Sequence, residues 1–221
     1  MNFSSIIKNW HLYVITDELL SKGRSHVEIA RLAIEGGADV IQLRDKIASS
    51  RKLYEHALAI RKITRESNTS FIVNDRLDIA LAVEADGVHV GQKDLPARVA
   101  RPLIGENKIL GVSAETLKEA IQAKKNGADY LGVGPIFEAR TTKPDAGKPK
   151  GLPLLRNIRQ KCQIPVIAIG GINQMNAKAT IQAGADGIAV ISAIVAAFDI
   201  AAASHELREI VANEREKLGR G

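Results

Sequence analysis

The chain has little cysteine, few aromatic residues and no long apolar run. Cys162 is the one cysteine among 221 residues, so no disulfide can form within the chain, and we expect a reducing, cytoplasmic compartment. No segment approaches the ~20 apolar residues of a membrane-spanning helix. The first ten residues also lack the apolar core of a signal peptide. These absences predict a protein without a membrane partner.

Aromatic residues make up 4% of the chain and hydrophobic residues 45%, so the core must be built from Val, Ile, Leu and Ala. Such side chains are typical of buried parallel strands covered by helices. The net charge of +6 is scattered through helical segments, as at Arg61-Lys62 and Lys124-Lys125, without the interleaved aromatics of a nucleic-acid surface. We therefore expect no nucleic-acid partner and interpret the charge as attraction for anionic small molecules.

Short apolar runs alternate with stretches of helical spacing from one end of the chain to the other. The expected strands span residues 11–16, 40–44, 71–75, 87–90, 109–114, 130–136, 165–172 and 187–194. The expected helices span residues 25–35, 49–67, 76–83, 96–104, 115–126, 152–161, 173–183 and 199–218. Eight such alternations without a linker predict an α/β protein, a single (β/α)8 TIM barrel over residues 1–221.

A Gly-Ala-Asp sequence recurs where a helix meets a strand. It begins residues 37–40, 127–130 and 184–187, and residues 85–88 are a degenerate copy. The glycine suits a left-handed helix end and the aspartate a tight turn, so we expect a structural role at the amino-terminal rim of the strands. One long irregular segment, residues 137–151, is rich in Gly, Pro and Lys and predicts an active-site loop.

In a barrel of this kind the chemistry lies where the strands end. Reading each expected exit in turn gives Thr16-Asp17, Arg44-Asp45-Lys46, Asn74-Asp75, Gln92 with Asp94, Ser113, Thr141-Thr142-Lys143, Gly170-Gly171 and Ser192. The strand bodies themselves are almost wholly apolar. The convergence of these residues on one rim predicts the functional site there.

Asp75 and Asp94 close neighbouring strands and form a candidate metal pair. Hard carboxylate oxygens suit Mg²⁺, which also binds substrate phosphates. The alternative for either residue is a helix N-cap, which Asp94 fits because Leu95-Pro96 follows it.

Phosphate binding is predicted at two further places. Arg44 and Lys46 offer a bidentate fork and a mobile charge, unless they form a surface pair neutralised by Asp45. The paired glycines after the seventh strand and Ser192 after the eighth stand where phosphate sites recur in barrels, unless the glycines only permit a tight turn. His89, inside the fourth strand, is interpreted as a packed, hydrogen-bonded core histidine.

Eight segments, in order, resemble the thiamine-phosphate synthase family and the related thiazole tautomerases. They read LYVITD (12–17), QLRDK (42–46), FIVND (71–75), DGVHVGQKD (86–94), GVSA (111–114), DYLGVGPIF (129–137), IGGI (169–172) and VISA (190–193). Singly the glycine pairs are common among barrels, but the ordered set is specific.

The resemblance implies a transferase that couples a pyrimidine methyl diphosphate with a thiazole phosphate and releases pyrophosphate, with Mg²⁺ as cofactor. It implies that the diphosphate substrate contacts Gln42, Leu43, Arg44, Asp45, Lys46, Asn74, Ser113 and Lys143. It implies Asp75 and Asp94 as metal ligands, and thiazole-phosphate contacts at Thr141, Thr142, Gly171, Ile191 and Ser192. The catalytic residues implied are Arg44, Lys46, Ser113 and Lys143.

One departure from the family pattern follows the sixth strand. The family usually reads Phe-Pro-Thr, a variable residue, then Thr-Lys, whereas this chain reads FEARTTK over residues 137–143. A thiazole tautomerase, a non-catalytic phosphate-sensing regulator and a phosphate-binding aldolase or epimerase stay open as alternatives. Retention of Asp75 and Asp94 beside Arg44 and Lys46 favours the synthase. The sequence leaves the oligomeric state open and is compatible with a homo-oligomer.

Overall fold

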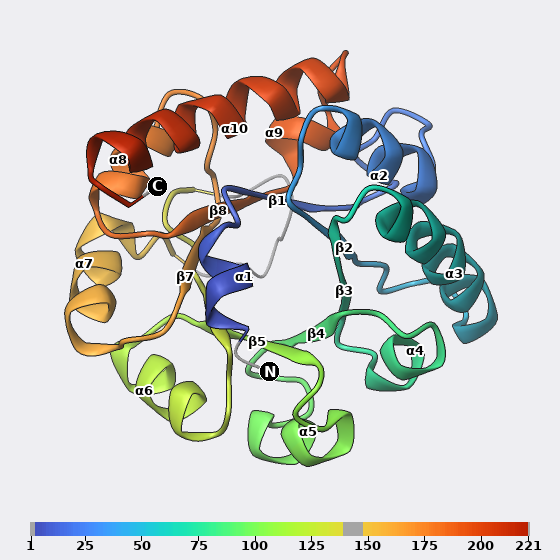
Figure 1. Ribbon diagram of the computed structural model, residues 1–221, viewed down its shortest axis with the longest axis horizontal. Helices are drawn as coiled ribbons and strands as arrows, with labels where there is room; N and C mark the ends of the chain where they lie inside the picture. Colours follow the sequence, from blue (N-terminus) through green and yellow to red (C-terminus); the bar gives the residue numbers. More distant parts are fainter. Residues whose placement is uncertain (1–2, 139–147, 221) are drawn as a thin grey trace.

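The computed structural model describes residues 3–138 and 148–220. Eight parallel strands close into a barrel in sequence order, each hydrogen-bonded to the next and the last to the first. Figure 1 shows the helices arranged as an outer ring around these strands. The expected (β/α)8 barrel is confirmed. Within the described residues, no helix combines the length and the apolar character needed to cross a membrane.

The strands are β1 (Leu12–Ile15), β2 (Val40–Leu43), β3 (Ser70–Asn74), β4 (Gly87–Val90), β5 (Ile109–Ala114), β6 (Tyr130–Val133), β7 (Val166–Ile169) and β8 (Gly187–Val190). The helices are α1 (Ser4–Lys8), α2 (His26–Glu35), α3 (Ser50–Glu66), α4 (Leu77–Ala82), α5 (Ala97–Ile104), α6 (Leu117–Lys125), α7 (Gly151–Lys161), α8 (Ala177–Gln182), α9 (Ser192–Val195) and α10 (Ile200–Lys217).

The last three strands end earlier than their apolar patterns predict. β6 ends before Gly134-Pro135, where proline offers no N–H to a neighbouring strand. β7 ends before Gly170, whose φ of 98° breaks the extended backbone. β8 ends at Val190, and Ser192 begins α9 rather than continuing the strand. The apolar residues that follow these three strands therefore belong to buried loops and not to the strands.

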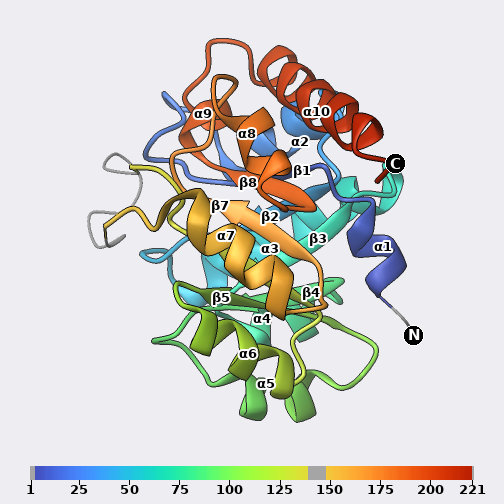
Figure 2. The ribbon, with the colours of Figure 1, turned by 90° about the vertical axis from the view of Figure 1, so that its left-hand side faces the viewer.

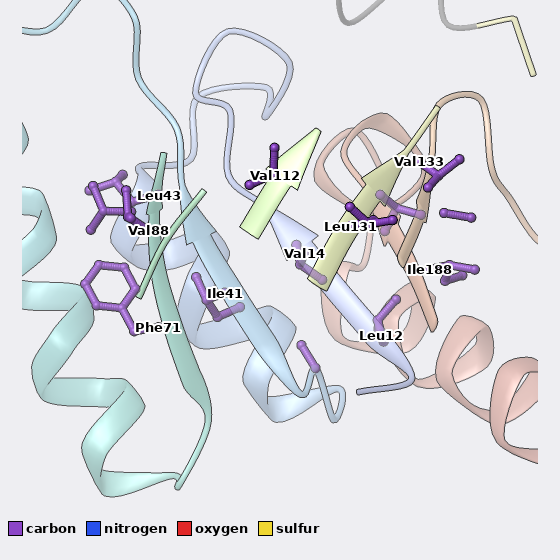
Figure 3. Packing of buried hydrophobic residues seen from close by; sticks show 14 of the residues in the cluster. Leu12, Val14, Ile41, Leu43, Phe71, Val88, Val112, Leu131, Val133 and Ile188 are labelled. Atoms are coloured by element: carbon purple, nitrogen blue, oxygen red, sulfur yellow. The ribbon is translucent and has the colours of Figure 1, made fainter. Parts of the chain in front are cut away.

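Each strand alternates between two apolar layers because successive side chains point to opposite faces. Outward residues such as Leu43, Phe71 and Val88 pack in the layer between strands and helices, as Figure 3 shows. Inward residues such as Ile72 and Ile167 fill the barrel itself. The chain thus buries both faces of its sheet, which explains why its strands read as nearly continuous apolar runs.

The short helix α1 closes the amino-terminal end of the barrel, and the sequence patterns did not predict it. Ile7 and Trp10 are buried with the inward-facing residues. The Trp10 ring lies 5.8 Å from the ring of Tyr13 and 5.3 Å from that of Tyr130, both edge-on. Figure 2 shows α1 at the same end as the last turns of α10. Because α1 closes the amino-terminal end, a ligand-binding site is expected at the carboxyl ends of the strands.

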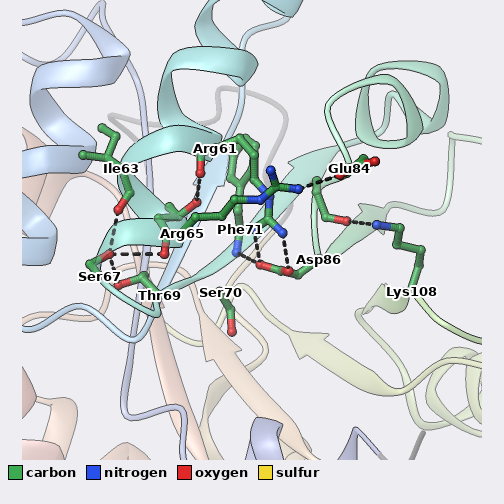
Figure 4. Close-up of polar contacts among 12 residues, drawn as sticks. Arg61, Ile63, Arg65, Ser67, Thr69, Ser70, Phe71, Glu84, Asp86 and Lys108 are labelled. Carbon is green, nitrogen blue, oxygen red and sulfur yellow. Dashed lines mark hydrogen bonds and ion pairs between the residues drawn. The ribbon is translucent and has the colours of Figure 1, made fainter.

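The recurring aspartates at the amino-terminal rim link the strands in pairs. Each carboxylate accepts a backbone N–H from the strand that precedes its own in the sequence and also pairs with an arginine. The sets are Asp39 with Leu12 and Arg208, Asp86 with Phe71 and Arg61, Asp129 with Leu110 and Arg101, and Asp186 with Val166 and Arg159. Figure 4 shows the Asp86 set, in which Arg61 donates two hydrogen bonds of 2.9 and 3.0 Å. The expected structural role is confirmed.

Candidate active site

A cavity of about 130 Å³ opens within the barrel at the carboxyl ends of the strands. Its polar wall comes from β2 to β5 and carries Gln42, Arg44, Asn74, His89 and Ser113. The opposite wall comes from β6 to β8 and is mostly apolar or glycine, with Gly132, Gly134, Pro135, Ile167, Ile169, Gly170, Ala189 and Ile191. A small molecule with one polar edge and one flat apolar face fits such walls.

A chain of hydrogen bonds crosses the floor of the cavity. Gln42 donates from Nε2 to the Tyr13 hydroxyl at 2.7 Å, and that hydroxyl lies 2.9 Å from the hydroxyl of Tyr130. His89 contacts Tyr130 through Nδ1 and the Ser113 hydroxyl through Nε2, both at 2.9 Å. Burial raises the pKa of both tyrosines, so both phenols stay neutral. The chain fixes the rotamers of Gln42 and Ser113 before any ligand arrives.

Two glycines inside the strands make room for this chain. A side chain at Gly111 would collide with the Tyr130 ring, and a Cβ at Gly132 would lie 2.8 Å from Cε1 of His89. His89 is hydrogen-bonded, as expected, but it lines the cavity rather than the packed core. Tyr13, Tyr130 and Glu115 also line it and were missed from the sequence. A glycine inside a strand was only a partial signal, because the ring that faces it follows from the register between strands.

Asp75 and Asp94 come together at the exits of β3 and β4. Their carboxyl groups share a hydrogen bond, and Lys46 Nζ lies 3.1 Å from Oδ2 of Asp75. Asp94 accepts a second hydrogen bond from the backbone N–H of Gly91 at 2.8 Å. Pro96, not Asp94, occupies the N-cap position of α5, so the N-cap alternative for Asp94 does not describe the structure.

The environment of this pair opposes two full negative charges. Burial and then the nearby Asp94 raise the pKa of Asp75. Burial also disfavours the charged form of Asp94, but its hydrogen bonds with Asp75 and Gly91 hold its pKa below the usual value. Two carboxyl groups in contact suit a bound proton or a hard cation between them. The residues present therefore fit Mg²⁺.

Arg44 and Lys46 both point toward acidic partners at the mouth. Arg44 lines the cavity with NH1 3.7 Å from Oδ2 of Asp17, and Lys46 is half-exposed beside Asp75. Asp45 turns away and accepts the backbone N–H groups of the two residues at 47 and 48, each at 2.9 Å. Asp45 therefore does not neutralise the two cations, and the alternative of a surface pair does not hold.

The remaining predicted residues fall into three groups. Asn74 and Ile191 line the cavity, whereas the Leu43 side chain is buried in the outer layer, away from it. Gly171, with φ of 64°, packs against the backbone of residues 137 and 138, and half-buried Ser192 begins α9 two residues after β8 ends. Thr141, Thr142, Lys143 and most of the 137–151 loop lie outside the described residues.

In parallel barrels that are enzymes, the active site lies at the carboxyl ends of the strands, where a partly polar cavity suits a small-molecule substrate. The fold and the cavity of this protein match the arrangement of such an enzyme.

The comparison with known proteins makes the assignment specific. The family model described as thiamine monophosphate synthase matches residues 12–194. A thiamine-phosphate synthase from Chloroflexus aurantiacus is 60% identical over 211 residues, covering 96% of this chain and 97% of the relative. One from Moorella thermoacetica is 57% identical over 208 residues, covering 94% and 99%. The chain belongs to the thiamine monophosphate synthase family and is a transferase enzyme.

A solved structure agrees with the family assignment, and a more distant one shares the fold. The thiamine phosphate pyrophosphorylase from Pyrococcus furiosus superposes with a TM-score of 0.87 at 47% identity, covering 95% of this chain and 98% of that one. A 3-hexulose-6-phosphate synthase, 22% identical with a TM-score of 0.67 and coverage of 91% and 99%, shares the barrel fold.

Proposed function

We propose that this enzyme joins a pyrimidine methyl diphosphate to a thiazole phosphate, releases pyrophosphate and depends on Mg²⁺. The observation that carries the proposal is the acidic pair Asp75–Asp94 with Lys46 beside it and Arg44 at the same mouth. Acidic and basic groups side by side at a cavity suit a cation-bound diphosphate, which neither set would hold alone. The names of its relatives support the same reaction.

The first task in this reaction is to stabilise the departing pyrophosphate. Arg44 and Lys46 place fixed positive charge where negative charge develops on the leaving oxygen. When bound at Asp75 and Asp94, Mg²⁺ would supply further charge neutralisation to the diphosphate. The Lys46–Asp75 contact of 3.1 Å keeps the ammonium group at this position before substrate binds.

The second task is to protect the carbon centre that the pyrophosphate leaves. The aminopyrimidine ring can delocalise the positive charge, so no protein nucleophile is required. The apolar wall of β6 to β8 excludes water from that centre, and Gln42 and Ser113, held by the hydrogen-bonded chain, orient the ring. The thiazole nitrogen then attacks the same carbon. Because both substrates are bound in one cavity mouth, this step is effectively unimolecular and so faster than a reaction between free molecules.

The proposal is tested by pyrophosphate release from the pyrimidine diphosphate with Mg²⁺, with and without thiazole phosphate. We expect thiazole-dependent release and an organic product with the mass of thiamine phosphate. A chelator should stop the reaction, and added Mg²⁺ should restore it. Thiazole-phosphate binding without any pyrophosphate release would instead support the tautomerase or the regulator.

Ser192→Asp tests the thiazole-phosphate site at the exit of β8. The new carboxylate is expected to weaken thiazole-phosphate binding at least about tenfold, because like charges a few ångströms apart repel. Isothermal titration calorimetry measures the change. Ser67→Asp, at the opposite end of the barrel after α3, adds the same charge and should leave the affinity unchanged. Equal affinities of both variants for the thiazole phosphate would show that its phosphate does not bind at this strand exit.

A further inference from the structure

Glu18, His26 and His56 form a cluster outside the cavity that the proposed reaction does not use. One ligand atom from each lies within 4.8 Å of the others. Glu18 follows β1, His26 begins α2 and His56 lies in α3, so three separate elements bring the cluster together. The two imidazole rings are 5.3 Å apart between centroids and tilted by 54°.

His26 is the fixed member of this cluster. It is only 2% exposed, and its backbone N–H donates to Oε1 of Glu18 at 2.9 Å. Its Nδ1 lies 2.7 Å from the Thr16 hydroxyl, and its Nε2 lies 3.3 Å from Oδ2 of Asp45. If either ring nitrogen takes a ligand, the partner of the other keeps the ring oriented, which is the arrangement of metal-binding histidines.

His56 supplies a second and independent observation. Its Nδ1 is buried and has no hydrogen-bond partner among the residues that the structure describes. A buried polar atom without a partner costs about 1–3 kcal/mol and in native structures calls for an ion, a water or a ligand. The cluster thus contains a histidine with one unsatisfied ring nitrogen, together with a carboxylate and a second imidazole.

We propose that Glu18, His26 and His56 bind a divalent transition-metal ion of the zinc type, at a site separate from the Asp75–Asp94 pair. Two imidazoles and one carboxylate select Zn²⁺, Co²⁺ or Ni²⁺ over Mg²⁺, which requires oxygen ligands. Atoms bound to tetrahedral zinc at about 2.1 Å lie about 3.4 Å apart. We expect rotations of the half-buried Glu18 and His56 side chains to bring the ligand atoms from within 4.8 Å of one another to that spacing.

The protonation state of His26 favours the ion. Burial lowers the pKa of His26, although the neighbouring carboxylates of Glu18 and Asp45 oppose the shift. A neutral imidazole at pH 7 offers a lone pair that a metal can take without competing for a proton.

The proposed metal site is also linked to the cavity mouth through Asp45. Asp45, the partner of His26 Nε2, stands between Arg44 and Lys46 in the chain. An ion bound through Nε2 of His26 would replace the contact that holds Asp45, and so would act on the segment that carries both cations. The ion would therefore adjust the diphosphate end of the mouth from outside.

The experiment titrates the purified full-length chain with Co²⁺ and with Zn²⁺ in excess Mg²⁺, without substrates. We expect one equivalent of Co²⁺ to give a visible absorption band of an imidazole-bound ion, and Zn²⁺ to displace it. His56→Ala should weaken Zn²⁺ binding at least about 100-fold. Glu18→Gln, which keeps an acceptor for the His26 N–H, should weaken it at least about tenfold.

His205→Ala is the matched control, because His205 is exposed on α10 far from the cluster in the chain. It should bind Zn²⁺ as the unaltered chain does, and so should Asp75→Asn. Absence of the band, or unchanged affinity in His56→Ala, would overturn the site. Because no substrate is present, either outcome is independent of the synthase assay.

Discussion

Replacing Asp75 with asparagine is expected to lower kcat/KM by about 100- to 1,000-fold at saturating Mg²⁺, the range for losing one group that stabilises transition-state charge. Asparagine keeps the size of the side chain and tolerates the φ of 61° at this position. Asp78→Asn is the matched control, since Asp78 is 63% exposed and pairs with Arg76 outside the cavity. Normal turnover in Asp75→Asn would refute the metal assignment.

The same substitution is expected to raise the melting temperature of the metal-free protein at neutral pH. Because burial and Asp94 raise the pKa of Asp75, the folded chain holds this proton more tightly than the unfolded chain. The protonated Asp75 therefore contributes its full stabilisation below the pKa of the unfolded chain, near 3.8. This stabilisation is lost as the pH rises through the raised pKa of Asp75 in the folded chain. Asparagine does not ionise, so the variant avoids this loss of stability at neutral pH. The substitution also removes the ion pair with Lys46, but Lys46 is half-exposed and the pair contributes little to stability.

Thermal unfolding with and without Mg²⁺ separates the two effects of Asp75. Mg²⁺ should raise the melting temperature of the unaltered chain, since a ligand that binds only the folded state stabilises it. It should have much less effect on Asp75→Asn. An equal Mg²⁺ shift in both proteins would place the ion elsewhere.

Asp186→Ala is expected to destabilise the barrel by about 1–3 kcal/mol, the cost of leaving a buried backbone donor without its acceptor. The carboxylate is 8% exposed and accepts hydrogen bonds from the Val166 N–H at 2.8 Å and from Arg159 at 3.0 Å. Its loss leaves a buried N–H at the start of β7 unsatisfied.

Urea unfolding measures this change in the free energy of unfolding. Asp78→Ala, which removes an exposed ion pair on α4, should cost no more than about 1 kcal/mol. If both variants lose the same small amount, the aspartate repeat does not hold the strands together.

The barrel and the acidic pair could be predicted because both depend on local order along the chain. Eight apolar runs fix the strand number, and strand exits of a parallel barrel share one rim, which brings Asp75 to Asp94. Side-chain alternation along β2 could also have separated inward Gln42 and Arg44 from Leu43, which points outward.

The hydrogen-bonded chain on the cavity floor could not be predicted in this way. It depends on the register between strands, which pairs His89 with Gly111 and Gly111 with Tyr130. Register is a property of two strands and leaves no mark on either alone. The α1 cap has a similar cause, since its five residues are stabilised by the barrel that they close rather than by helix propensity.

The aspartate repeat divides the barrel into four modules, β1–β2, β3–β4, β5–β6 and β7–β8, each closed by its own carboxylate. Between modules the strands pair through their backbones, and side-chain contacts such as His89–Ser113 and Lys46–Asp75 join them toward the carboxyl ends. A circularly permuted gene that opens the chain between two modules would keep every carboxylate link intact, whereas one that opens it inside a module would turn that link into a contact between distant ends. Four equivalent modules are also the arrangement that successive duplication of a two-stranded ancestor would leave.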